Sequence, residues 1–237
     1  MDVLFAGTNV NSVKLLTEAG FEVVIPGRQT CCGALQAHNG ETAVARELAR
    51  ANIRAFKEAG VDFIVSNAGG CGALLVEYDR LLEGDPAFRD EAAWFARRVK
   101  YISQLIVELG RMPVFREKSG RTVRVTYQDS CHLRNVMKAG ACPRTLLGRV
   151  EQAEFVEMEE ADRCCGSAVI YNLTQPEMSG RILQRKMEKV ARTGADYLVT
   201  SNPGCWLQME SGARQYPTPA GTKVMHIVDF LAERLAD

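Results

Sequence analysis

The sequence predicts an α/β protein built from two pseudo-symmetric domains with largely parallel sheets. The first observation behind this prediction is an internal repeat, in which residues 59–71 align with residues 193–205 and share Gly, Asp, Val, Gly and Cys in register. The second is a Cys-Cys-Gly motif upstream of each copy, at 31–33 and 164–166. The later single Cys follows after 40 residues in one half and after 41 in the other. The third is an alternation of short apolar runs with amphipathic segments, which is typical of parallel sheets joined by helices.

The same order of elements is predicted around both copies of the repeat. Residues 41–58 carry apolar side chains at helical spacing, and residues 61–66 form a short β-rich run. In the second half, residues 174–193 have the helical pattern and residues 197–201 the β-rich run. A glycine follows each helix as a stop signal. Helix, glycine, strand and a Gly-Cys loop are therefore expected in each half.

Local patterns predict the remaining elements. Short β-rich runs predict strands at residues 3–6, 23–25, 123–127 and 155–158. Helical periodicity predicts helices over residues 92–109 and 227–235. The segment 111–121 is rich in charge and contains one Pro and one Gly, which indicates a link between the halves. We therefore expect a first domain over residues 1–115 and a second over residues 122–237.

The composition excludes several classes of function. The 237 residues include 29 Lys and Arg against 29 Asp and Glu, so the net charge is zero and no nucleic acid partner is expected. No apolar run approaches the roughly 18 residues that span a bilayer, and no export signal opens the chain, so a cytoplasmic protein without a membrane span is expected. Eight cysteines in such a chain predict reduced thiols with a chemical role.

The cysteines of the second half follow strands or begin loops. They are Cys131, Cys164, Cys165 and Cys205. Because ligands gather beyond the carboxyl ends of parallel strands, these thiols are expected to converge, and four thiolates suit Zn²⁺ or an iron-sulfur cluster. Structural zinc sites usually use Cys pairs separated by roughly two to four residues, so the spacing here favours an iron-sulfur cluster and leaves zinc open. Inert buried thiols are a third explanation, which the duplicated spacing weakens.

Four motifs carry a resemblance to a known family. They are Cys-His-Leu at 131–133, Cys-Cys-Gly-Ser-Ala at 164–168, Ile-Tyr-Asn-Leu-Thr-Gln-Pro-Glu-Met-Ser at 170–179, and Asn-Pro-Gly-Cys at 202–205. Together they resemble the tandem cysteine-rich (CCG) domains of the glycolate oxidase iron-sulfur subunit family. The lactate-utilisation iron-sulfur protein and the heterodisulfide reductase B subunit carry related domains. The resemblance extends over essentially the whole chain.

The resemblance implies iron-sulfur centres, of the [4Fe-4S] type in cubane or non-cubane form. In the second half the implied ligands are Cys131, Cys164, Cys165 and Cys205. In the first half they are Cys31, Cys32 and Cys71. Zinc is a possible substitute for the cluster.

The same resemblance implies a non-catalytic electron-transfer subunit. Such a subunit relays electrons from a flavoprotein that oxidises glycolate, lactate or a similar 2-hydroxy acid. A ferredoxin-type subunit is an implied further partner, and peripheral membrane association would come through the partners. The alternatives are a heterodisulfide-reductase-like enzyme that cleaves a disulfide on a non-cubane cluster, and a zinc-stabilised binding module.

The chain departs from the family pattern in three ways. Both final loops keep a single Cys, Cys71 or Cys205, where heterodisulfide-type relatives have Cys-x-x-Cys. No closely spaced cysteines of a ferredoxin segment precede the first motif. The first half has no counterpart of Cys131, and the repeat puts that residue two or three positions before Met1. We therefore expect the first centre to retain metal less well than the second.

Several other residues have an ordinary explanation beside a functional one. Cys142 has no counterpart in the repeat and is expected to be a passive thiol. His132 either hydrogen-bonds a sulfur or is held by a carbonyl, His38 is a candidate fourth ligand of the first-half cysteines, and His226 is expected to be structural. Residues expected either beside the cluster or as turn and cap residues are Asp129, Asn67 and Asn202. No glycine-rich nucleotide motif follows a strand, so the flavin is expected on a partner.

Overall fold

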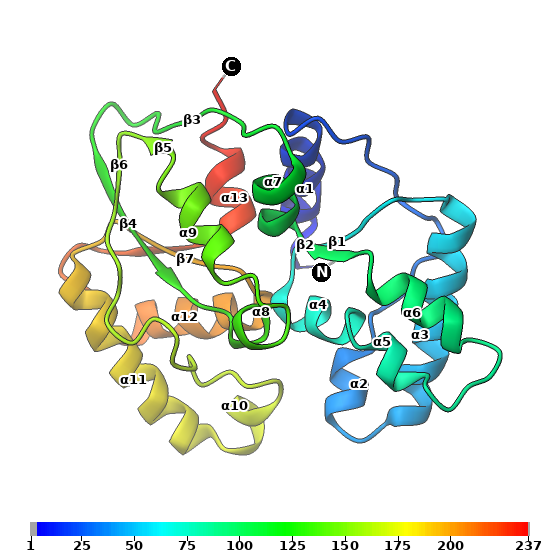
Figure 1. Cartoon of the computed structure of the whole chain (residues 1–237). Helices are drawn as coiled ribbons and strands as arrows, with labels where there is room; N and C mark the ends of the chain where they lie inside the picture. Colours follow the sequence, from blue (N-terminus) through cyan, green and yellow to red (C-terminus); the bar gives the residue numbers. More distant parts are fainter. Residues whose placement is uncertain (1–3, 237) are drawn as a thin grey trace.

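Two sheets of parallel strands organise the protein, one in each half of the chain (Figure 1). The computed structural model describes residues 4–236. The first half contains α1 (Ala6–Glu18), α2 (Ala34–His38), α3 (Thr42–Ala59), β1 (Ile64–Ser66), α4 (Gly69–Leu75), α5 (Tyr78–Leu81), α6 (Arg89–Ala96), β2 (Val99–Tyr101) and α7 (Ile102–Leu109). The chain continues with β3 (Phe115–Arg116), β4 (Val123–Gln128), α8 (Cys131–Asn135), α9 (Ala141–Leu147), β5 (Val150–Glu151), β6 (Ala153–Phe155), α10 (Tyr171–Thr174), α11 (Pro176–Thr193), β7 (Tyr197–Thr200), α12 (Pro203–Gln215), β8 (Lys223–His226) and α13 (Ile227–Ala232).

The larger sheet lies in the second half and has four parallel strands in the order β6-β4-β7-β8. Its central ladder joins β4 to β7, with Val125 opposite Tyr197. In the first half, β1 and β2 form a two-stranded parallel sheet in which Ile64 is opposite Val99. The strands β3 and β5 form a further short parallel ladder. This arrangement confirms the predicted α/β class with parallel sheets.

The sequence repeat is also a structural repeat. The helices α3 and α11 each have 18 residues, and each ends at a glycine in the left-handed region, Gly60 with φ 65° and Gly194 with φ 60°. A side chain with a Cβ is strained in this conformation, which explains a glycine at both stops. Each helix is followed by a strand, β1 or β7, and then by a helix, α4 or α12. The predicted order of elements around the repeat is confirmed.

The helix predicted over residues 92–109 is wrong in its middle. There α6 ends at Ala96, β2 occupies three residues, and α7 begins at Ile102. Within β2, Val99 is opposite Ile64 and is buried. Pairing with β1 therefore outweighs the helical periodicity, because the partner strand is distant in sequence and a local pattern does not reveal it.

The strand predicted at residues 23–25 is also wrong. These residues have no regular secondary structure, and Val24 and Ile25 are 48% and 67% exposed. Val23 packs against the main core, but the run has no partner strand among the described residues. Hydrophobic composition alone therefore does not make a strand at this position.

Two further strand predictions differ from the structure, one in position and one over its described part. The strand predicted at residues 155–158 is β6, which ends at Phe155. For the strand predicted at residues 3–6, Val3 lies outside the described residues. The described part of that segment contains no strand, and Ala6 begins α1.

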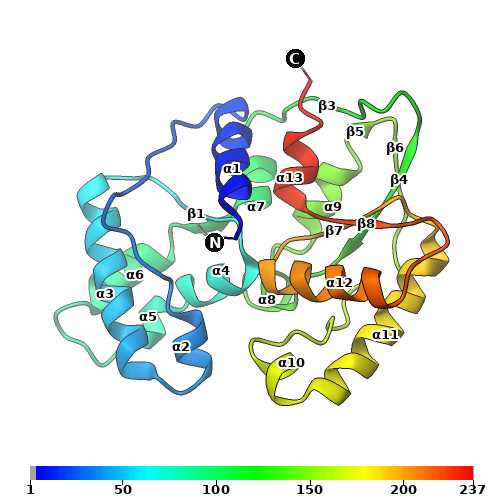
Figure 2. The same cartoon turned by 180° about the vertical axis from the view of Figure 1, so that it is seen from behind.

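One hydrophobic core runs through both halves and includes Leu15 of α1 and Tyr127 of β4. The first and last helices, α1 and α13, lie side by side (Figure 2), and Thr8 Oγ1 donates a hydrogen bond to Asp229 Oδ2 at 2.7 Å. The predicted link contains β3, which pairs with β5 of the second half. The boundary between residues 115 and 122 therefore stays a prediction. No helix within residues 4–236 is both long and apolar enough to cross a bilayer.

Candidate metal centre

A cavity of about 240 Å³ lies between the two halves, and five cysteines line it. Cys71 comes from the first half. The others come from the second half and are Cys131, Cys164, Cys165 and Cys205. The cavity lies beyond the carboxyl ends of β1, β4 and β7, which is where ligands of parallel sheets are expected. The structure thus brings together all four predicted second-half ligands and one of the three predicted in the first half.

The three single cysteines occupy equivalent positions in the fold. Cys71 is the third residue of α4, Cys205 is the third residue of α12, and Cys131 is the first residue of α8. Each of these helices begins a few residues after a parallel strand. In the first turn of a helix the backbone N–H groups have no partner within the helix, so this end favours negative charge. The start of each helix therefore suits a negatively charged group bound beside these cysteines.

The two Cys-Cys-Gly turns share one hydrogen bond. Gly33 N donates to Cys31 Sγ at 3.5 Å, and Gly166 N donates to Cys164 Sγ at 3.3 Å. Both glycines have left-handed backbones, with φ 82° and 97°. A Cβ at Gly166 would lie 2.7 Å from the backbone oxygen of Ser179, so only glycine fits there. The motif therefore encodes a turn that directs a backbone N–H at a sulfur.

Burial and neighbouring thiols perturb the cysteines of the second half. The hydrogen bond with Cys165, followed by burial, raises the pKa of Cys164. Burial, followed by the charge of Cys164, raises the pKa of Cys131. Metal binding at these thiols therefore displaces protons, because thiolates are the ligands.

The first-half pair lies apart from the cavity wall. Cys31 is exposed and Cys32 is half-buried, and neither lines the cavity. Side-chain hydrogen bonds hold their backbone in place: Asn52 Nδ2 donates to Cys31 O at 3.0 Å, and Tyr78 Oη donates to Cys32 O at 2.8 Å. A hydrogen bond between the thiols raises the pKa of Cys32 and lowers that of Cys71. Cys71 thus lies between the pair and the cavity.

Within residues 4–236, no three His, Cys, Asp or Glu side chains form a group that could hold one metal ion. The site predicted from Cys31, Cys32 and Cys71, with His38 as a candidate fourth ligand, therefore stays a prediction. The five thiols of the cavity are distributed around its wall and do not converge on one point. A cluster distributes its thiolates over several irons, and this donor set fits such a group better than it fits a single ion.

Comparisons with known proteins agree with this geometry. The sequence model of the CCG cysteine-rich domain matches residues 1–76 and 125–210. The chain belongs to the CCG family. Both matches contain a Cys-Cys-Gly turn and a single Cys at the start of a helix, so the two halves of the structural repeat are two CCG domains.

Named relatives of this CCG protein align over nearly its whole length. A Bacillus subtilis protein named "Probable glycolate oxidase iron-sulfur subunit" is 48% identical over 233 residues, which is 98% of this chain and 52% of that protein. Lactate utilization protein A of Oceanobacillus iheyensis is 32% identical over 97% of this chain and 92% of its own length. The Geobacillus thermodenitrificans protein of the same name is 30% identical, with coverage of 99% and 95%. The chain therefore spans about half of the first relative and nearly all of the other two.

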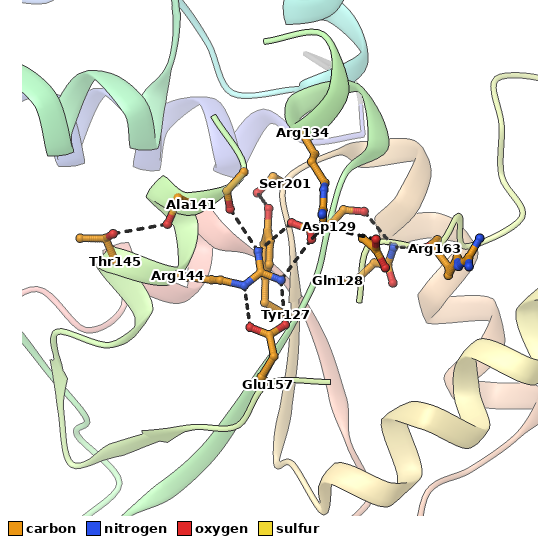
Figure 3. A network of polar contacts seen from close by, with 12 residues as sticks. Tyr127, Gln128, Asp129, Arg134, Ala141, Arg144, Thr145, Glu157, Arg163 and Ser201 are labelled. Carbon is orange, nitrogen blue, oxygen red and sulfur yellow. Dashed lines mark hydrogen bonds and ion pairs between the residues drawn. The ribbon is translucent and has the colours of Figure 1, made fainter. Parts of the chain in front are cut away.

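A buried carboxylate lies beside the cavity of the CCG protein (Figure 3). The Asp129 side chain is 1% exposed, and Arg144 donates to its two oxygens at 2.9 and 3.1 Å. Arg134 adds a contact of 3.2 Å, and Arg144 also binds Glu157 at 2.6 and 2.7 Å. Asp129 was expected either beside the cluster or as a turn or cap residue, whereas Arg144 was not identified. A buried carboxylate requires a cation, but the sequence does not reveal which of its many basic residues supplies it.

Hydrogen bonds also join the segments that carry the ligands. Gln128 Nε2 donates to the backbone oxygen of Arg163, the residue before Cys164, at 3.1 Å. Asn202 Oδ1 accepts from Gly70 N at 2.9 Å, across the two halves, while its Nδ2 donates to Cys205 Sγ at 3.5 Å. Of the two roles expected for Asn202, beside the cysteines or as a turn and cap residue, its side chain has the contact with a cysteine sulfur. Asn67 instead donates to side chains of α1 at 2.9 Å.

Two of the three histidines line the cavity, whereas His226 and Cys142 do not. His38 and His132 line the cavity with their ring centres 5.5 Å apart, and His132 Nδ1 lies 3.6 Å from Cys131 Sγ. His226 caps α13, where its Nδ1 accepts from Val228 N at 3.3 Å, which confirms its predicted structural role. Cys142 is in α9 and does not line the cavity.

Proposed function

We propose that this CCG protein is an iron-sulfur electron-transfer subunit that works with a flavoprotein. The observation that carries this proposal is the cavity between the halves, whose wall contains five thiols. The names of the relatives support it, because one is an iron-sulfur subunit of glycolate oxidase and the others act in lactate utilization. The proposed electron source is a flavoprotein that oxidises glycolate, lactate or a similar 2-hydroxy acid.

The proposed ligands of the main centre, a [4Fe-4S] cluster, are Cys131, Cys164, Cys165 and Cys205. Such a cluster would supply one-electron transfer, and the groups that surround it would not need to move. Neutral hydrogen-bond donors around it stabilise the thiolates, with Gly166 N donating to Cys164 and Asn202 Nδ2 donating to Cys205. The proposed second centre uses Cys31, Cys32 and Cys71.

The chain is proposed to transfer electrons rather than to oxidise the hydroxy acid itself. Hydride removal from a 2-hydroxy acid needs a flavin or nicotinamide acceptor. The sequence has no glycine-rich motif for such a nucleotide, so the partner is proposed to supply the flavin. A ferredoxin-type subunit as the next electron carrier and a cytoplasmic location, with contact to a membrane only through partners, belong to the same proposal.

The test is metal analysis of the chain assembled with iron and sulfide without oxygen. We expect iron and sulfide to bind together, and the visible absorption to bleach when a flavoprotein partner and glycolate or lactate are added. The isolated chain should not turn over either acid. Binding of zinc alone, without sulfide, would contradict the proposal and favour the zinc-stabilised module. Reduction of a small disulfide by the loaded chain, without bleaching by a flavoprotein, would favour the heterodisulfide-type enzyme.

A further inference from the structure

A buried cation lies on α11, the helix that shares a small core with Cys165 and Cys205. Lys186 of α11 is 3% exposed, and its Nζ donates to the backbone oxygen of Glu160 at 2.6 Å. Within residues 4–236 no carboxylate forms an ion pair with it, whereas Arg185 and Lys189 on the same helix pair with Glu160 and Glu159. Burying a lysine is costly unless negative charge compensates it. The position of Lys186 therefore needs an explanation beyond the hydrogen bond to a carbonyl.

The side of α11 that carries Lys186 packs against the wall of the metal centre. Leu183 and Met187, on either side of Lys186 in the helix, belong to the same small core as Cys165 and Cys205. Burial lowers the pKa of Lys186, and the nearby Cys165, Asp162, Glu160 and Cys164 act against this lowering, with Cys165 contributing most. Lys186 does not line the cavity, and its charge is close enough to Cys165 to interact with it through the protein.

The first half has a neutral residue at the equivalent position. Asn52 precedes Gly60 by the same number of residues as Lys186 precedes Gly194, on helices of equal length. Asn52 is buried too, and its Nδ2 donates to the backbone oxygen of Cys31. Both helices thus carry a buried donor at this position, and it is neutral in the first half and charged in the second.

We infer that Lys186 is a buried counter-charge that raises the reduction potential of the centre held by the second-half thiolates. The inference rests on the proposed function. One electron passes from the reduced flavin of the partner to the thiolate-bound iron, which gains one negative charge. No bond forms or breaks, and Lys186 keeps its proton. A fixed cation in a medium of low dielectric constant stabilises the more negative, reduced state over the oxidised one.

The alternative is that Lys186 only satisfies the carbonyl of Glu160. Lys186→Gln separates the two roles, because glutamine retains an N–H donor and loses the charge. Lys189→Gln is the matched control, since Lys189 is one turn further along α11 and its charge is paired with Glu159 at 2.7 Å. Lys186→Arg keeps the charge and tests whether α11 tolerates substitution at this position.

The experiment is redox titration of the anaerobically loaded full chain, with iron per chain measured on each sample. Lys186→Gln is expected to retain iron and to shift its reduced-to-oxidised ratio about tenfold towards oxidised at a fixed potential, which is about 59 mV for one electron. Lys189→Gln and Lys186→Arg are expected to stay within twofold of the unmodified chain.

Two results would overturn the inference while the proposed function stands. One is a loaded Lys186→Gln protein with an unchanged potential, and the other is an equal shift in Lys189→Gln. If Lys186→Gln does not fold, a Lys186→Arg protein whose potential falls as iron is retained would also overturn it. An unmodified chain that binds no iron would instead contradict the proposed function, and the inference would fall with it.

Discussion

The ion pairs of Arg144 provide a test of how burial determines the strength of an interaction. Asp129 and Glu157 bind the same guanidinium group, and the contacts of Glu157, at 2.6 and 2.7 Å, are shorter than those of Asp129, at 2.9 and 3.1 Å. Distance alone would rank Glu157 first. The Glu157 side chain is 50% exposed, however, whereas the Asp129 side chain is 1% exposed. Burial therefore ranks Asp129 first.

Asp129→Asn is expected to lower the free energy of unfolding by about 2 to 3 kcal/mol. Breaking a fully buried pair by removing one partner costs about 3 to 5 kcal/mol. We take a smaller value because the side chains of Arg144 and Arg134 are 26% and 46% exposed, so water screens part of the lost interaction. Glu157→Gln removes an exposed partner and is expected to cost about 1 kcal/mol or less.

The assay is urea unfolding of the metal-free chain at constant pH, followed by far-ultraviolet circular dichroism. The midpoint should fall clearly for Asp129→Asn and little for Glu157→Gln, with the same dependence on urea in all three proteins. Equal losses in the two variants would refute the reasoning from burial. A loss below about 1 kcal/mol for Asp129→Asn would show that the pair is screened like a surface pair.

Three further predictions concern ligands, a turn and pH. Cys165→Ser should abolish most iron binding at the second-half centre while Cys142→Ser leaves iron per chain unchanged, and equal iron contents would reject the ligand assignment. Gly166→Ala should lower the free energy of unfolding in urea by about 2 to 4 kcal/mol, because Gly166 has a left-handed backbone and lies close to a carbonyl oxygen. Gly180 has open space around it, so Gly180→Ala should leave stability unchanged or raise it slightly. Burial lowers the pKa of His226 to about 4 from its usual 6.5, so the unfolded chain binds the extra proton between these values. Stability should therefore be retained above pH 6.5 and fall by about 3 kcal/mol towards pH 4, and an unchanged pH profile in His226→Asn would contradict this assignment.

The sequence predicts the elements whose signals are local or duplicated. The helices α3 and α11 and the strands β1 and β7 are found where the repeat predicts them, because helical periodicity and the stop glycines lie within each segment. The strand β2 was missed because its stability comes from Ile64, 35 positions away from Val99 in the register of the two strands. Such pairing is a property of the folded chain.

In the candidate site too, features with local signals were predicted and features that depend on tertiary contacts were not. The convergence of the four second-half cysteines was predicted from their places at strand ends, and the structure brings them together. The sequence did not indicate that Cys71 joins their cavity while Cys31 lies at the surface. This arrangement depends on how the two halves pack. Arg144 and Lys186 were also missed, since their partners are assembled only by tertiary contacts.

The position of the cavity between the halves has a thermodynamic consequence. Its wall takes Cys71 from one half and four cysteines from the other, and Gly70 and Asn202 are hydrogen-bonded across the same boundary. Any group that binds both walls adds its binding free energy to the association of the halves, about 2.7 kcal/mol at a free concentration 100 times its dissociation constant. Separation of the halves must then release that group. Occupancy of the cavity and the cooperativity of unfolding are therefore linked, because a bound group adds to the shared core that already joins the two halves.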